Sequence, residues 1–388
     1  MKNYLLSQFI GDKKYIYISL LLSFSIIAFY HISNGYVMSP DSYTYSRWAD
    51  ELIKLEFNFI SYYAQNTFIA PSFFYTTPVL IISLMKVIFE AEWQTAFLIF
   101  NLSLLLLSQL LIIKSLLLLE VRPVLISLTM FVLITSVDLL VWPRYVLSDM
   151  IFSFLVILSI YIMIKGFVTG KLNFIGIISV IGIIFLSRPS SLPILFTFFS
   201  FFVITRFQIL TKPKIILLLF LLFFIITPLF FSYLHQLSEI NLNENKLTGF
   251  LFSMVKEGMI IHDRPETWIS SPISFIDVSY LYFIRLINFF RPYIDAFSSI
   301  HILLNSLVAI IILFSITIWI FFGGKIKSHD KTILFILLLS FFVAAYHAFT
   351  LIDYDWRYRF PIIMPLIMIF PITLEILFKK VNSKIQIE

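Results

Sequence analysis

Apolar segments of about the length that a helix needs to cross a bilayer recur along this chain, separated by short polar breaks. The pattern predicts an all-α polytopic membrane protein with about 10–12 transmembrane helices. Two segments are short enough to form a re-entrant pair, namely 173–187 and 191–206. Segment 73–89 could also span the membrane, but Pro71, Pro78 and Lys86 interrupt it, so we expect a helix that lies at the membrane interface. The predicted spans are 14–32, 93–118, 123–141, 146–164, 173–187, 191–206, 213–234, 299–322, 332–350 and 360–378.

The composition agrees with this class of protein. Of the 388 residues, 60% are hydrophobic and 13% are charged, whereas a soluble domain is about half apolar and about a quarter charged. We therefore expect a single transmembrane domain over residues 1–388 and no nucleic-acid partner. The chain contains no cysteine, which excludes disulfides, thiol catalysis and cysteine-ligated metals.

The basic residues predict the orientation in the membrane. Lysines crowd alternate loops, as cytoplasmic loops do, and few acidic residues share those loops. The N-terminal segment has basic residues before its apolar run and no small-residue cleavage site, which predicts an uncleaved signal anchor. We expect a multi-pass protein of the plasma (inner) membrane with both termini cytoplasmic. The loops on the cytoplasmic side hold Lys13, Lys14, Lys114, Arg122, Lys165, Lys171, Lys325, Lys331, Lys379 and Lys380, among others.

In the loops on the outer side, the basic residues are mostly arginines. The positive-inside rule does not explain cations there, whereas the planar fork of arginine suits phosphate or carboxylate. Two outer regions are large, 33–92 and 235–298, and each contains a segment expected to form an amphipathic or interfacial helix, at 43–57 and 280–297. The predicted outer arginines are Arg47, Arg144, Arg188, Arg264, Arg285, Arg291, Arg357 and Arg359.

Asp41 follows the first span directly and is the leading catalytic candidate. One interpretation is a helix N-cap, because Pro and Asp are common at helix starts. The other is a general base just outside the bilayer, aimed at an acceptor hydroxyl. Asp50 and Glu51 are more typical of a solvated helix face.

Two further outer sites combine charge with a span end. Arg144 and Asp149 flank the start of one span, either as a local ion pair or with Asp149 orienting a reacting group and Arg144 contacting phosphate. Arg188 and Pro189 separate the two short apolar segments, where they form either a simple turn or irregular backbone that lines a cavity. Arg188 is then a candidate ligand for a lipid headgroup.

The segment 351–367 carries the densest charge. Asp353 and Asp355 form an Asp-Tyr-Asp triplet, but metal-binding motifs of that kind belong to soluble nucleotide-binding domains. Arg357 and Arg359 fit better as a phosphate clamp, or alternatively as an interfacial charge belt. The secondary candidates are Asp353, Asp355, His262 and Arg291. No paired-histidine spacing predicts a zinc site, no cofactor is expected, and a requirement for a divalent metal stays open.

Taken in order, these motifs resemble the GT-C superfamily of membrane glycosyltransferases, in particular the protein mannosyltransferases and lipid A aminoarabinose transferases. The resemblance implies a bundle of the GT-C type and inverting transfer of a sugar from a polyprenyl-phosphate donor on the outer face. It implies Asp41 as the catalytic base, and Arg188, Arg357 and Arg359 as ligands of the lipid phosphate. Many relatives have Asp-Glu where this chain has Asp41-Ser42, so a second acid is either unnecessary or supplied by Asp149. The segments that carry the resemblance are Pro40-Asp41-Ser42 with Tyr45, 75–93, Ser148-Asp149, Arg188-Pro189 and 357–367.

Three functions are therefore open. The first is a glycosyltransferase that modifies a cell-surface glycan or a lipid-linked acceptor, as in lipopolysaccharide biosynthesis. The second is a polysaccharide polymerase or ligase of the O-antigen type, which would use lipid-diphosphate-linked glycans and need no acid in the first loop. The third is a transporter or flippase, for which we would expect charges at mid-bilayer and two symmetric halves.

Overall fold

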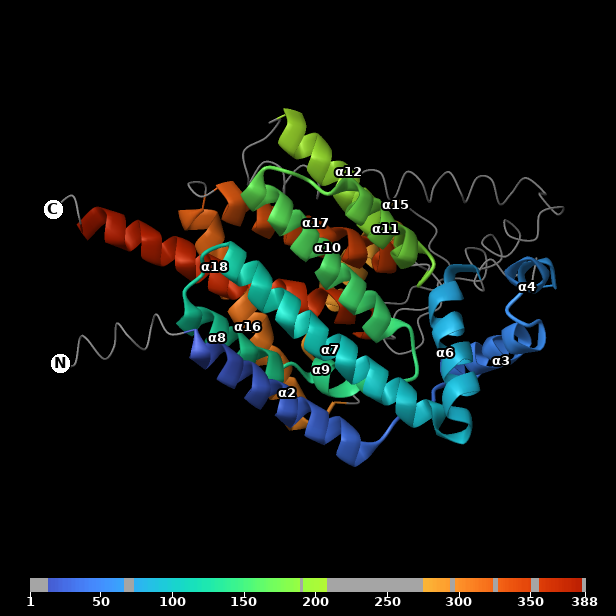
Figure 1. Ribbon diagram of the computed structural model, residues 1–388. Coiled ribbons are helices and arrows are strands. Elements are labelled where there is room, and N and C mark those ends of the chain that lie inside the picture. Colours follow the sequence, from blue (N-terminus) through green and yellow to red (C-terminus); the bar gives the residue numbers. More distant parts are fainter. Residues whose placement is uncertain are drawn as a thin grey trace.

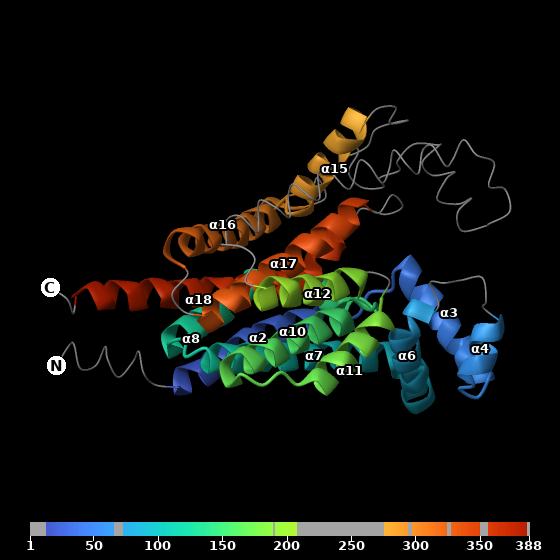
Figure 2. The same ribbon diagram turned by 90° about the horizontal axis from the view of Figure 1, so that it is seen from above.

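The structure is a computed structural model that describes residues 13–65, 73–188, 191–207, 275–293, 297–323, 327–349 and 356–385. These residues form helices and connecting turns, and no β-strand occurs among them. Most of the long helices run side by side as a bundle, and α3, α4 and α6 lie across one of its ends (Figures 1 and 2). The protein is thus an all-α, multi-pass membrane protein.

Three helices form the centre of the bundle: α7 (Trp93–Leu118), α10 (Asp149–Thr169) and α18 (Phe360–Ile385). Their contacting side chains are mostly Leu, Ile, Val, Met and Phe, which pack without polar partners. The most thoroughly buried of the candidate spans contains α18, which also has two prolines inside it, Pro365 and Pro371.

Outer helices cover this centre. Helix α2 (Lys14–Asn34) packs on α8 (Pro123–Ile134), which continues through α9 (Val137–Val141) into the short turn η2 (Trp142–Arg144). On the other side, α16 (Ser299–Phe322) packs on α18, and α17 (Lys327–Phe349) lies against α12, α15 and α18. The start of α2 and the end of α18 lie at the same end of the bundle (Figure 1), while the orientation of that end toward the cytoplasm stays a prediction.

The described residues contain six helices long and apolar enough to cross a membrane, or seven if the pair α8 and α9–η2, bent by 60°, counts as one span. This is fewer than the expected number for two reasons. The segments around Arg188 form only α11 (Phe174–Phe185) and α12 (Leu192–Phe207), and a 12-residue helix such as α11 is only about 18 Å long. The predicted span 213–234 lies outside the described residues, so the full count stays a prediction.

The far end of the bundle carries the polar helices. Helix α3 (Pro40–Lys54) has Trp48 and Leu52 on its buried face and packs on α6 (Thr76–Phe89). Helix α4 (Phe59–Gln65) follows α3, and the turn η1 (Glu90–Glu92) joins α6 to α7 through Glu90, whose φ is +46°. Helix α15 (Phe275–Phe289) packs on α17. The predicted helices at 43–57 and 280–297 thus correspond to α3 and α15, each shifted by several residues.

Candidate functional site

The local sequence at the start of α3 leaves the Asp41 carboxylate available. Ser39 is the N-cap: its hydroxyl accepts from the Ser42 backbone N–H, and the Ser42 hydroxyl accepts from the Ser39 backbone N–H at 3.0 Å. Pro40 occupies the first position of the helix, where its missing N–H costs nothing. The N-cap interpretation of Asp41 is therefore wrong, because the two serines already form a capping box.

Asp41 instead meets the turn η5 (Trp356–Arg359), which precedes α18. The Arg357 Nη1 atom donates to the Asp41 Oδ2 atom at 2.9 Å. The Asp41 side chain is 47% exposed, whereas that of Arg357 is 13% exposed. No described residue donates a hydrogen bond to the other carboxylate oxygen of Asp41. A half-exposed carboxylate with a vacant acceptor thus lies against a mostly covered guanidinium group.

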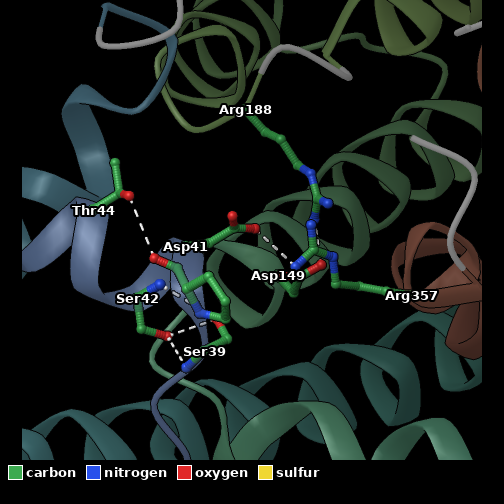
Figure 3. A network of polar contacts seen from close by, with 8 residues as sticks. Ser39, Asp41, Ser42, Thr44, Asp149, Arg188 and Arg357 are labelled. Carbon is green, nitrogen blue, oxygen red and sulfur yellow. Dashed lines mark hydrogen bonds and ion pairs between the residues drawn. The ribbon is translucent and has the colours of Figure 1, made fainter. Parts of the chain in front are cut away.

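A second ion pair lies beside the first. Asp149, at the start of α10, accepts a hydrogen bond from Arg188, and both side chains are buried. Figure 3 shows the Arg188 and Arg357 side chains, which come from different parts of the chain, converging between Asp41 and Asp149. Both guanidinium groups also approach the ring of Tyr358, at 4.9 Å for Arg188 and 5.3 Å for Arg357. The two pairs form one cluster, which we call the Asp41 site.

Aromatic side chains pack around the Asp41 site. The rings of Tyr45, Trp48 and Tyr75 are in mutual contact, with Tyr45 and Tyr75 at 4.9 Å between centroids. Burial raises the pKa of Tyr45 well above its ordinary value, and nearby Tyr75 adds to this, while Arg188 opposes it. Burial likewise raises the pKa of Tyr75. Both phenols therefore stay protonated at neutral pH and act as neutral walls.

Sequence reasoning did not assign two buried residues, His347 and Arg285, to this region. His347, near the end of α17, is buried and stacks on Tyr358 with the ring planes 6° apart and centroids 4.2 Å apart. Phe289 of α15 stacks near the same imidazole. Arg285, also in α15 and fully buried, donates to the backbone carbonyl of Ala348 at 3.1 Å. Arg285 was predicted only as one of the outer arginines and not as a site residue. His347 was not proposed for a site because it lies in a predicted span.

Two of the predicted phosphate ligands lie elsewhere. Arg144 donates to the carbonyls of Asn34 and Gly35, at 2.7 and 2.9 Å, and so braces the chain between α2 and α3. It is not the partner of Asp149. Arg359 pairs with Asp138 of α9, with Nε and Oδ2 3.3 Å apart and both side chains buried. We call these two residues the Asp138–Arg359 pair.

The remaining candidates separate into two groups. The Arg291 backbone carbonyl accepts a hydrogen bond from Arg359, and the Arg291 guanidinium lies over the Tyr293 ring. Asp353, Asp355 and His262 lie outside the described residues. Within the described parts of the chain, no group of three or more His, Cys, Asp or Glu side chains could hold a metal ion.

Comparisons of the chain with protein-family models, with curated proteins and with solved structures found no match. The arrangement of the side chains is therefore the basis for a functional proposal.

Proposed function

We propose that this protein is a membrane glycosyltransferase that moves a sugar from a polyprenyl-phosphate donor to a hydroxyl of a cell-surface glycan or lipid-linked acceptor, with inversion. The observation that carries the proposal is the Asp41–Arg357 pair, with 2.9 Å between Nη1 and Oδ2, next to the second guanidinium of Arg188. A carboxylate and two guanidinium groups at one end of a transmembrane bundle supply a base for an acceptor and cations for a lipid phosphate.

The pairing suggests an order of events. A donor phosphate that enters between Arg188 and Arg357 competes with Asp41 for the Arg357 guanidinium and leaves the carboxylate free to accept a proton. The acceptor oxygen then attacks the anomeric carbon, its proton passes to Asp41, and the bond between the anomeric carbon and the phosphate oxygen breaks. The phosphate takes the bonding electron pair, and its charge is stabilised by the guanidinium groups.

Asp149 has a different role in this proposal. Its side chain is only 2% exposed and is engaged by Arg188, so it does not reach an acceptor as Asp41 does. A buried arginine without a counter-ion is costly. Asp149 is thus a positioning residue that holds the Arg188 guanidinium toward the cluster.

The proposal is tested by replacing Asp41. The full chain in lipid nanodiscs is given a panel of prenyl-monophosphate and prenyl-diphosphate hexoses and pentoses, with membrane extract as the acceptor source. Release of the prenyl phosphate is measured by mass spectrometry. D41N should lower turnover by about 10²–10⁴-fold, the usual contribution of a general base, while the free energy of unfolding falls by less than about 1 kcal/mol.

Asp50 provides the matched control. It lies on the same helix, is half-exposed, and pairs with Lys86 through Nζ and Oδ1 at 2.7 Å, so D50N removes a similar ion pair away from the site and should leave turnover unchanged. Full turnover in D41N would remove Asp41 as the base. Turnover of only the diphosphate-linked donors, unaffected by D41N, would favour the polymerase or ligase function instead.

A further inference from the structure

An apolar cavity of about 530 Å³ lies between α15, α16, α17 and α18, and its lining includes Arg359 of η5 but no residue of the Asp41 site. This volume is in the range of sites for small molecules. Its walls are almost entirely Leu, Ile, Val and Phe side chains. One surface of α16 lines it from Asn305 to Ile320, a length of about 22 Å along the helix axis. The cavity is therefore long enough for a hydrocarbon chain.

The cavity opens toward the side of the bundle. Three of its lining residues, Ile287, Leu313 and Ile320, are 53%, 64% and 53% exposed. Helix α16 is a candidate span whose surface is largely uncovered by the rest of the protein. A ligand thus enters from the hydrocarbon phase of the bilayer.

Besides Ser340, whose hydroxyl donates to the Ile336 backbone carbonyl, the cavity has two polar features. Asn305 is 6% exposed and lines the cavity, and its Nδ2 atom has no hydrogen-bond partner among the described residues. An unsatisfied amide donor in an apolar environment is costly, and a hydrogen-bond acceptor on a ligand would offset that cost. The second feature is the Asp138–Arg359 pair.

The balanced charge of this pair limits the class of ligand that the cavity can bind. Arg359 is the one cation among the described lining residues, and its charge is balanced by Asp138. A phosphate monoester would find no free cation inside the cavity, whereas an ester carbonyl needs only a neutral donor. Asn305 lies about 9 Å below the start of α16 at Ser299, a depth suited to the ester region of a lipid rather than to its headgroup.

We propose that this cavity holds one acyl chain of a bilayer glycerophospholipid, and that the ester carbonyl of that chain accepts a hydrogen bond from the Asn305 side-chain amide. The site is separate from the Asp41 site and does not depend on the proposed transfer reaction. The phosphate of the lipid stays outside the cavity, at the level of the bilayer headgroups.

The test uses the full chain, delipidated in detergent and titrated with palmitoyl-oleoyl phosphatidylglycerol while native mass spectrometry counts bound lipid. Wild type should bind one tight lipid. A309F places a ring in the cavity and should weaken that binding by more than about tenfold. Ile310 is 61% exposed and does not line the cavity, so I310F is the matched control and should bind as wild type does.

Replacement of Asn305 by leucine, which has the same number and branching of side-chain heavy atoms, tests the hydrogen bond. N305L should weaken binding of the diester lipid by about threefold to tenfold, which corresponds to the loss of one hydrogen bond. It should leave the diether analogue, which has no ester carbonyl, unaffected. Equal binding of lipid by wild type, A309F and N305L would overturn the proposal. So would tighter binding of undecaprenyl phosphate than of the phospholipid, if A309F abolished it.

Discussion

Arg357 and Arg359 are two residues apart on the same short turn, yet their ion pairs differ in almost every respect. Arg357 pairs with a carboxylate that is 47% exposed, whereas Arg359 pairs with one that is only 2% exposed. The exposed pair is well solvated on one side and can exchange partners at little cost. The buried pair has no solvent to replace either partner, so each residue depends on the other. The comparison shows that two arginines on one turn can differ in whether water or a ligand can reach their carboxylate partners.

The largest expected effect is a difference in protein stability when each of the two ion pairs is removed. D138N leaves the Arg359 guanidinium buried without a counter-ion and should lower the free energy of unfolding by about 3–5 kcal/mol. D41N, which removes the partner of Arg357, should lower it by less than about 1 kcal/mol. Thermal unfolding in the same detergent measures both. Similar losses in the two variants would show that the pairs are energetically alike.

A smaller effect distinguishes the two arginines by activity. R357K keeps the charge but loses the planar fork, so kcat/KM for the prenyl-phosphate donor should fall by about tenfold with little change in melting temperature. R359K is the matched variant on the other side of the turn. It should lower the melting temperature and leave the kcat/KM of the folded fraction near that of wild type. The reverse pattern would exchange the roles assigned to the two residues.

The smallest expected effect concerns pH. Burial raises the pKa of Tyr45, so the folded protein holds that proton at a pH where the unfolded chain, with an ordinary value of about 10, has released it. The stability that Tyr45 contributes is therefore complete below about pH 10 and is lost as the pH rises toward the folded pKa. Y45F should reduce this alkaline loss, measured as the melting temperature between pH 8 and pH 11. An identical decline in both proteins would assign the loss to other groups.

Much of the helical architecture could be predicted from hydropathy, because a bilayer leaves few alternatives to a helix for an apolar segment of span length. The segments that became α2, α7, α16 and α17 were found within a few residues. The bend between α8 and α9 was not found, because Thr135 and Ser136 hardly interrupt the apolar pattern. The lengths of α11 and α12 were recognised as short, and the structure confirms this.

The candidate site was likewise predictable only in part. Asp41, Arg188 and Arg357 could be named because each is a charge beside a span end. Their pairing could not be predicted, because Asp41 and Arg357 are separated by more than three hundred residues of sequence. Asp138 was missed because it lies inside an apolar segment and its partner comes from the other end of the chain. Arg144 was misassigned because backbone carbonyls, which sequence composition does not display, are its acceptors.

The geometry of η5 explains how one short turn serves two separate ion pairs. A 3₁₀ turn advances by about 120° per residue, so Arg357 and Arg359 point in widely different directions while Tyr358 stacks on His347 between them. An insertion of a single residue would shift this spacing by about 120°, whereas a substitution would keep it. The backbone spacing of the turn is therefore what directs two nearby arginines to two separate carboxylates.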